Sequence, residues 1–361
     1  MDISTILIFI LILFVVVIGH EFGHFIVARW CGVKVEEFGF GLPPKLFGYK
    51  PKKSDTEYTF NLLPLGGFVR LFGEEGEFKN DSRSFASKTK LQKIAILVAG
   101  VTMNLIIAII VFTIVGMMGS VTLIEDTDIG KVKDPAIYVV DVAKESPAGE
   151  KEIMLGDKII SINGTVISNN SDLLNIINDN KGKEIDLVLE RQGESLSKTL
   201  FARENPPEGQ GSMGIGFSLG GLLKLNFWDA FVSSLTRIYF IFYMTFYTLW
   251  QLFIGIFVDT QLPAGASFTG PIGIVKEVGN AQAMGISYLL MITGMISTSL
   301  AFFNILPIPA LDGGRILFIL IEMIKKSPIN KELEAKFHLT GYLLLIGLML
   351  FITFRDIINL F

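Results

Sequence analysis

The chain has 361 residues, of which 50% are hydrophobic and 18% are charged, with a mean hydropathy of +0.53 and a net charge of −4. A soluble domain usually carries about 25% charged residues, so this composition indicates a membrane protein with a soluble portion. It excludes a disordered chain and a basic nucleic-acid binder, and the single cysteine, Cys31, excludes a disulfide-stapled secreted scaffold. We therefore expect no nucleic acid among its partners.

Four apolar runs are predicted to be transmembrane helices. The first covers Ile3–Ile18 and continues through a polar motif to Ala28, which fits the ~20 residues that a helix needs to span a bilayer. A signal peptide is a poor alternative because Met1-Asp2 is acidic and no small-residue cleavage site follows. The other three runs are 94–119, 286–305 and 342–354.

Charge predicts how these runs are oriented. Twelve Lys or Arg residues lie between Arg29 and Lys93, and cytoplasmic loops carry the positive excess. The segment 125–204 holds sixteen acidic residues against ten basic ones and is predicted to lie outside. Lysines after the third run indicate that this run ends inside. The aromatic-rich stretch 227–258 can then make no net crossing, so we interpret it as an interfacial or re-entrant segment.

The segment after the second run has the pattern of a small α+β domain. Strand-like stretches surround a tight turn at Asn163-Gly164, and a short helix is predicted over 171–177. The succession Ser146-Pro147-Ala148, Gly156-Asp157 and Asn163-Gly164 resembles a PDZ domain of the bacterial protease type, and another small β-rich domain is the alternative. The resemblance implies a peptide groove between the predicted helix and a strand that contains Ile137, Tyr138 and Val139.

The pattern His20-Glu21-Phe22-Gly23-His24 lies in the first apolar run. Two histidines at i and i+4 are about 40° apart around a helix because each residue turns ~100°, so both imidazoles can hold one Zn²⁺. Glu21 lies beside such an ion, where it can take a proton from bound water. The chain has only three histidines, and ionisable residues inside an apolar helix are costly and usually functional.

A catalytic zinc site needs a third protein ligand and leaves the fourth position for water. His338 follows a lysine cluster, and we interpret it as a solvated surface histidine. Asp312 lies in the motif 304–315, at the inner end of the third run, where two prolines break the helix and Gly313-Gly314 permits close backbone approach. Irregular backbone at membrane depth is tolerated where it is buried or lines a cavity. Asp312 is therefore the better candidate to complete a site for one zinc ion per chain.

Together, the H-E-x-x-H pattern, the N-x-x-P-x-P-x-L-D-G motif and the PDZ-like segment resemble the site-2 protease family of intramembrane zinc metalloproteases. The bacterial RseP/RasP type with one PDZ domain is the most similar group, and the resemblance covers nearly the whole chain. Two departures are the single PDZ-like domain, where some members have a tandem pair, and Val101, where a proline is common. Further matches are Gly39-Phe40-Gly41, 64–70, Gly73-Glu74, Ala99-Gly100 with Asn104, and Gly270-Pro271-Ile272.

The resemblance implies cleavage of a peptide bond within or near the transmembrane helix of a single-pass protein substrate, in contact with membrane lipids. A helix hides its carbonyls in hydrogen bonds, so the substrate must unwind. In the family, a membrane-associated β-hairpin pairs with the unwound substrate, and residues 58–63 and 67–71 have strand character. Gly67, Phe68 and Val69 are then expected to bind substrate, with an ordinary loop as the alternative.

Two asparagines are further candidates for substrate binding. Asn304 belongs to the motif before Asp312, and Asn104 lies in the second apolar run. Asn304 would hydrogen-bond the substrate backbone or would only satisfy the proline-broken helix. Asn104 would line the cavity or would only bridge helices.

The predicted fold is a polytopic α-helical membrane protein with about four transmembrane helices, an inserted α+β PDZ-like domain and a membrane-associated β-hairpin. We expect it in the bacterial cytoplasmic membrane, with the PDZ-like domain outside. The resemblance implies that this domain and the interfacial segment act together as a size filter for substrates already trimmed outside. Its predicted parts are an N-terminal membrane core (1–120), the PDZ-like domain (125–205), the interfacial region (206–283) and a C-terminal membrane core (284–361).

The expected function is regulated intramembrane proteolysis of trimmed anti-sigma factors or remnant signal peptides, which are substrates typical of the family. A catalytically silent PDZ-containing scaffold and a metal transporter are the alternatives. The intact Glu21 argues against the first, because a scaffold needs no base. The scarcity of other ionisable residues in the apolar runs argues against the second.

Overall fold

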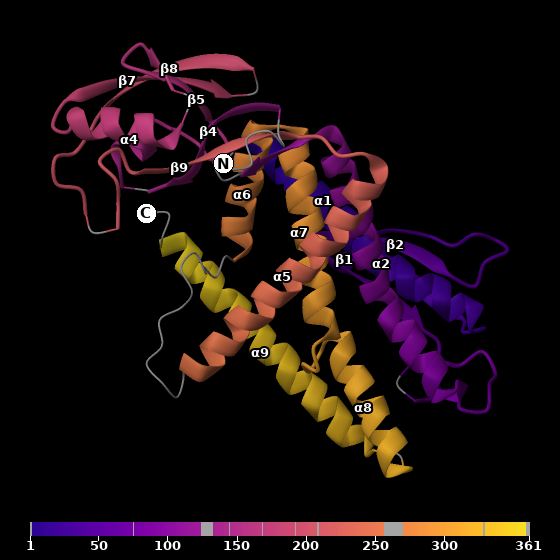
Figure 1. The fold of residues 1–361 in the computed structure, drawn as a ribbon. Coiled ribbons are helices and arrows are strands. Elements are labelled where there is room, and N and C mark those ends of the chain that lie inside the picture. The colour runs from indigo at the N-terminus through magenta and orange to yellow at the C-terminus, as the bar shows by residue number, and fades with distance from the viewer. Residues whose placement is uncertain are drawn as a thin grey trace. The chain divides into compact units, whose positions relative to one another are not determined.

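The structure is a computed structural model that describes residues 2–358 apart from 75, 124–132, 144, 168, 192, 208, 256–269 and 328. The predicted domain start at 125 and the stretch 256–269 of the predicted interfacial region lie outside the described residues. The chain, drawn in Figure 1, forms two compact units. The first comprises Met1–Phe112, Ser233–Gly279 and Met291–Phe361, and the second comprises Thr113–Val232 and Asn280–Leu290.

Within the described residues, five helices are long and apolar enough to cross a membrane. Four of them cover the four predicted runs, except that the helix over the second run ends at Met118, one residue before the predicted end. The fifth, α5, covers the aromatic stretch as one continuous helix, and none of its most apolar window is buried. Its length permits a crossing, so the interfacial interpretation stays a prediction. The five helices are α1 (Ile3–Trp30), α2 (Lys90–Met118), α5 (Phe227–Gly255), α7 (Ile286–Ile305) and α9 (Lys331–Ile358).

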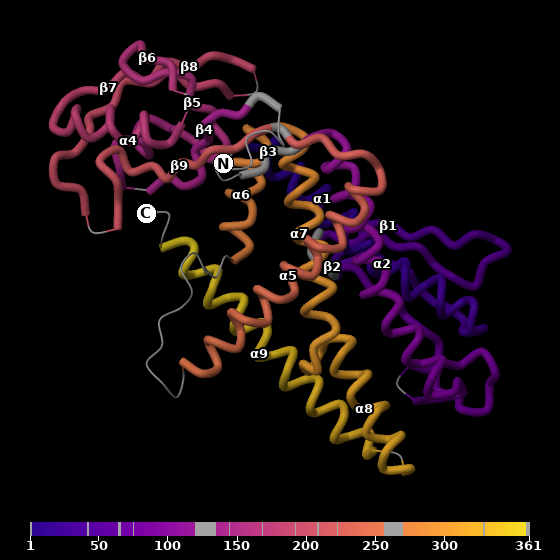
Figure 2. The backbone as a smooth tube through the Cα atoms, in the orientation of Figure 1, coloured from indigo at the N-terminus to yellow at the C-terminus, as the bar shows by residue number. Residues whose placement is uncertain are grey.

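A β-hairpin in the first unit consists of β1 (Val35–Tyr49) and β2 (Glu57–Leu71) and lies beside α1 (Figure 2). Residues 37–40 of β1 pair with 67–70 on one side and with 57–60 on the other. The predicted stretches 58–63 and 67–71 are therefore consecutive parts of β2, and their partner is β1. The segment 67–71 is an edge, because its pairings in the structure are all with β1.

The first unit also holds the proline-containing loop between α7 and α8 (Asp312–Lys325). Glycines at 313 and 314 are required here because an added Cβ would lie 2.1 Å from the Leu306 carbonyl oxygen and 2.4 Å from the Ile308 carbonyl oxygen, respectively. The loop thus folds back closely over the first turn of α8. Helix α8 runs beside α9 (Figure 2). The rings of Phe318 and Phe337 are in contact, with their centroids 5.1 Å apart. Helix α6 (Pro271–Met284) precedes α7.

The second unit is built on an antiparallel sheet with the strand order β3-β9-β4-β5-β7-β8, in which β6 pairs with β5. The predicted turn at Asn163-Gly164 joins β5 to β6, and both residues have positive φ angles (48° and 76°). The sheet extends beyond the predicted 125–205 at both ends, because β3 and β9 belong to it. The elements are β3 (Ser120–Leu123), β4 (Lys133–Val142), α3 (Pro147–Glu150), β5 (Lys158–Ile162), β6 (Thr165–Val166), α4 (Asn170–Asp179), β7 (Glu184–Arg191), β8 (Glu194–Phe201) and β9 (Ile215–Leu223).

The prediction that the strand with Ile137, Tyr138 and Val139, which is β4, borders the peptide groove is wrong. Ile137 and Tyr138 of β4 pair with β5 on one side and with β9 on the other, and Val139 pairs with β9 and donates its N–H to Asp157. All three residues are also buried. Because their backbone is paired on both sides, β4 offers no open edge to a peptide at these residues. A hollow lies instead between α4 and β9, and its lining includes Leu174, Ile177, Met213, Ile215 and Phe217.

Candidate active site

The two histidines of the first motif lie on the buried side of α1. Residues Ile12, Val16, His20, His24 and Ala28 recur every four positions and are all buried, which is the stripe that a helix presents to its neighbours. Small residues allow α2 to approach this stripe. A Cβ on Gly23, for example, would lie 2.3 Å from the Ala99 carbonyl oxygen of α2.

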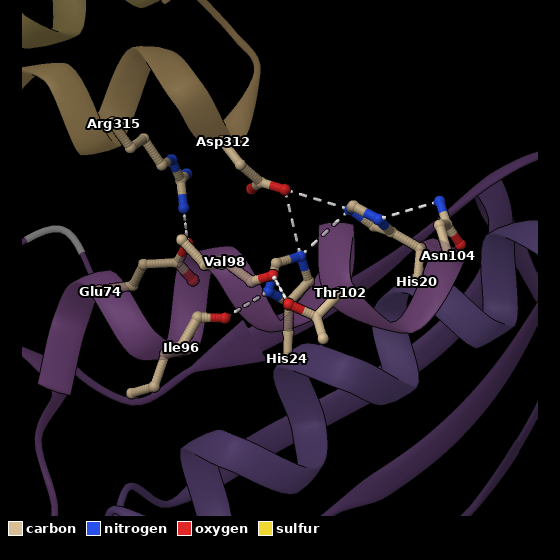
Figure 3. A network of polar contacts seen from close by, with 9 residues as sticks. All are labelled: His20, His24, Glu74, Ile96, Val98, Thr102, Asn104, Asp312 and Arg315. Atoms are coloured by element: carbon tan, nitrogen blue, oxygen red, sulfur yellow. Dashed lines mark hydrogen bonds and ion pairs between the residues drawn. The ribbon is translucent and has the colours of Figure 1, made fainter. Parts of the chain in front are cut away.

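Asp312 of α8 meets the two imidazoles, as Figure 3 shows. Its Oδ2 atom lies 3.1 Å from His20 Nε2 and 3.3 Å from His24 Nε2, and the two Nε2 atoms are 3.1 Å apart. Both histidines are at most 8% exposed. Residues from opposite ends of the chain therefore present three ligand atoms to one point.

The three converging ligand atoms of His20, His24 and Asp312 favour a bound cation. His24 Nδ1 lies 2.8 Å from the Ile96 carbonyl oxygen, to which it must donate a hydrogen bond, so the Nε2 of a neutral His24 carries a lone pair. Asp312 Oδ2 is buried and has no hydrogen-bond partner among the described residues. A tetrahedral zinc ion with ligands at 2.0–2.2 Å separates its ligand atoms by about 3.3–3.6 Å, close to the 3.1–3.3 Å between these three atoms. The spacing, the burial and the two-nitrogen, one-oxygen donor set therefore fit zinc.

Gly100 of α2 leaves the space in front of these atoms open. A Cβ at this position would lie 2.4 Å from His24 Nε2 and 2.7 Å from His20 Cε1. A side chain here would collide with the ligand atom of His24 and with the ring of His20, since contacts below about 3 Å are repulsive for carbon and nitrogen. The glycine is thus required by the pocket itself.

Glu21 is partly exposed and lies next to the edge segment of the hairpin. A Cβ on Gly67 would lie 3.0 Å from Glu21 Cγ, so the hairpin backbone passes close to the base. The neighbouring side chains are engaged elsewhere: the Phe68 ring lies over Gly39, and Val69 packs on a buried cluster that contains Phe25. Any substrate contact at Gly67, Phe68 and Val69 is therefore expected to involve their backbone.

Three other candidates have different positions. Asn104 of α2 is fully buried, with its Nδ2 3.4 Å from His20 Nδ1. Asn304 is buried in the last turn of α7, which ends at Ile305. His338 lies in α9, and its Nδ1 accepts a hydrogen bond of 3.0 Å from the Ala310 N–H, so it supports the loop before Asp312. Its interpretation as a solvated surface histidine is wrong, because its Nε2 is buried.

The sequence does not predict the ion pair between Glu74 and Arg315. Glu74 follows the hairpin, and Arg315 lies one turn of α8 after Asp312 (Figure 3). Glu74 belongs to the Gly73-Glu74 match and Arg315 to the motif 304–315. Their pairing depends on long-range packing that no local pattern reveals.

Comparison with known proteins places these residues in a family context. The profile of peptidase family M50 matches residues 8–348. A protein of Clostridium perfringens, provisionally named as a zinc metalloprotease, is 36% identical over 95% of both chains. Zinc metalloprotease RasP of Oceanobacillus iheyensis is 28% identical over 99% of this chain and 100% of its own length. The PDZ domain of an SdrC-like protein from Listeria innocua aligns with 23% of this chain and 92% of its own, at 19% identity and a TM-score of 0.21.

Proposed function

The chain belongs to peptidase family M50, and we propose that this multi-pass membrane zinc metalloprotease cleaves peptide bonds within or near the transmembrane segments of other membrane proteins. The observation that carries the proposal is the convergence of His20 Nε2, His24 Nε2 and Asp312 Oδ2 within 3.3 Å of one another. These three atoms would hold one zinc ion. When bound, such an ion supplies a Lewis acid and lowers the pKa of a bound water to about 7.

Glu21 acts as the general base in this proposal. It neighbours His20 in sequence, and its side chain is only partly buried, so water and substrate can reach it. Its carboxylate takes the proton of the attacking water and afterwards gives it to the leaving amine. The position of Gly67 beside Glu21 supports this role, because a substrate held at the hairpin edge would lie close to the base.

The hairpin edge would hold the substrate in an extended form. A transmembrane helix hides its carbonyl groups in its own hydrogen bonds, so the scissile segment has to unwind before attack. The segment 67–71 pairs on one side with β1, and strand addition at its other side would provide partners for the freed backbone groups. Asn304 is proposed to assist from the end of α7.

The second unit would select substrates. We assign it as a PDZ-like domain from its sequence pattern, and we place its peptide groove between α4 and β9. Residues 215–219 of β9 have one side without a strand partner among the described residues, which suits strand addition. The charge pattern supports a bacterial cytoplasmic membrane with this domain outside. Anti-sigma factors already trimmed outside, or remnant signal peptides, are the proposed substrates.

A cleavage assay with purified protein tests this function against the scaffold and transporter alternatives. A single-pass test substrate reconstituted with the enzyme should be cut in its transmembrane region. A chelator should stop cleavage and added zinc should restore it. Absence of cleavage with zinc bound would favour the scaffold, and zinc uptake into sealed vesicles would favour the transporter.

A further inference from the structure

The two metal-binding imidazoles of the proposed site need acceptors for their second nitrogen. A neutral histidine that binds a metal through Nε2 carries its hydrogen on Nδ1, and this N–H usually donates to a carboxylate, a carbonyl or water, which fixes the orientation of the ring. His24 has such an acceptor, the Ile96 carbonyl oxygen at 2.8 Å. For His20, the group that faces Nδ1 is the side-chain amide of Asn104 (Figure 3).

Asn104 has the burial expected of a positioning residue. It is 0% exposed, which leaves no surface for a substrate. Its backbone carbonyl accepts a hydrogen bond of 2.8 Å from Ser297 Oγ, which joins α2 to α7 at this point. The amide therefore lies at the contact between two helices, and it is directed at His20.

The Asn104 amide can present either its nitrogen or its oxygen to His20 Nδ1. In the structure, Nδ2 lies 3.4 Å from His20 Nδ1, and Oδ1 is buried and has no hydrogen-bond partner in the part of the chain that is described. Once Nε2 binds a metal, Nδ1 carries a hydrogen, and two N–H groups would face each other. Amide oxygen and nitrogen are assigned from the hydrogen-bond network, and a half-turn of the amide brings Oδ1 opposite Nδ1–H.

We propose that Asn104 is the positioning residue of His20, with its Oδ1 accepting a hydrogen bond from His20 Nδ1–H in the zinc-bound protein. This inference rests on the proposed zinc site and deepens it. Asn104 then does not bind substrate, in contrast to the expectation from the sequence. Both imidazoles would be oriented from α2, one by a backbone carbonyl and the other by a side chain.

Two variants of the full-length protein separate an acceptor from a packing role. Asn104→Asp keeps the shape of the side chain, and its carboxylate can only accept hydrogen bonds. Asn104→Leu keeps the volume of the side chain and can neither donate nor accept a hydrogen bond. We expect Asn104→Leu to weaken zinc binding by about 10–100-fold, measured by competition with a chromophoric chelator. Asn104→Asp should bind zinc at least as tightly as the wild type, because a carboxylate raises the basicity of the ligand histidine.

Ser297→Ala serves as the packing control, since it removes the neighbouring interhelical hydrogen bond and leaves the amide intact. It should lower the thermal stability and leave zinc affinity unchanged. Equal zinc affinity of Asn104→Leu and wild type would overturn the inference, as would an Asn104→Asp protein that binds zinc as weakly as Asn104→Leu. A wild type that binds no zinc would overturn both this inference and the proposed function.

Nitrogen-15 labelling of histidine provides a readout that needs no loss-of-function variant. With three histidines in the chain, the imidazole signals of the zinc-loaded protein are few enough to assign. His20 should show a protonated, hydrogen-bonded Nδ1, and Asn104→Asp should shift this signal while those of His24 and His338 stay in place. An unshifted His20 signal in Asn104→Asp would contradict the proposal, even if Asn104→Leu does not fold.

Discussion

Glu74 and Arg315 form an ion pair that joins the end of the hairpin to the helix bearing Asp312. Glu74 Oε2 also accepts a hydrogen bond of 3.2 Å from the Leu71 N–H, so the carboxylate holds the last residue of β2 and α8 together. The edge segment proposed to bind substrate and the proposed metal ligand are thus connected through one side chain.

Removing either charge is expected to lower cleavage by a small factor and to leave zinc content unchanged. Arg315 is about half exposed, with 47% of its side chain accessible, and pairs of this kind contribute about 0.2–1 kcal/mol. Glu74→Gln is the suitable partner for Arg315→Gln, because its amide oxygen can still accept from Leu71. In a double-mutant cycle on kcat/KM, the two changes should not be additive. Strict additivity would show that the pair does not couple the hairpin to α8.

Gly100→Ala is expected to abolish zinc binding in a folded protein. The added methyl group would lie 2.4 Å from His24 Nε2, whereas alanine in a helix is more favourable than glycine by about 1 kcal/mol. Gly347→Ala in α9 is the matched control, because a Cβ there meets nothing within 4 Å. Zinc content and thermal unfolding are measured on both proteins. A Gly100→Ala protein with the zinc content of the wild type would refute the position assigned to the metal.

His338 is expected to support the loop that carries Asp312 into the site. His338→Leu removes the acceptor of the Ala310 N–H and should weaken zinc binding modestly, since a hydrogen bond of this kind contributes about 0.5–1.5 kcal/mol. His338→Asn should retain most of the affinity, because its Oδ1 can take the place of Nδ1. Chelator competition compares the two, and equal affinities would assign the loop conformation to its prolines and glycines alone.

Arg191 and Asp157 are expected to stabilise the second unit. Arg191 donates hydrogen bonds of 2.6 and 2.7 Å to the two carboxylate oxygens of Asp157, which is 1% exposed. These bonds raise the pKa of the Arg191 guanidinium, so a rise in pH does not break the pair. Arg191→Met leaves a buried charge unpaired, which costs roughly 3 kcal/mol or more.

Hydrogen exchange of the β7 amides in the whole protein measures this loss. The double variant Asp157→Asn with Arg191→Met should recover part of the protection, because no unpaired charge remains. Wild-type protection in Arg191→Met would show that the pair contributes little.

Local patterns predicted the helices and the residues that converge in the structure. Apolar runs of sufficient length predicted α1, α2, α7 and α9, and the i, i+4 spacing predicted that His20 and His24 share a face. Asp312 could be predicted because two prolines and two glycines mark an irregular segment. The strand β1 was missed, since its glycines and prolines hide the strand pattern.

Long-range pairing could not be predicted from one sequence. The position of β9 between β3 and β4 decides which strand borders α4, and the strand-like pattern of Ile137, Tyr138 and Val139 says only that β4 is a strand. The pairing of Glu74 with Arg315 depends on how the end of the hairpin packs on α8, and the position of Asn104 beside His20 depends on how α2 packs on α1.

Zinc content and cleavage, measured together on the wild type and on Glu21→Gln, test the central claim most directly. The wild type is predicted to hold one zinc ion per chain and to cut its substrate. Glu21→Gln should hold the same amount of zinc and lose cleavage by about 10²–10⁴-fold, because only the base is removed. Wild-type protein without zinc, or a Glu21→Gln protein that cleaves at the wild-type rate, would contradict the account.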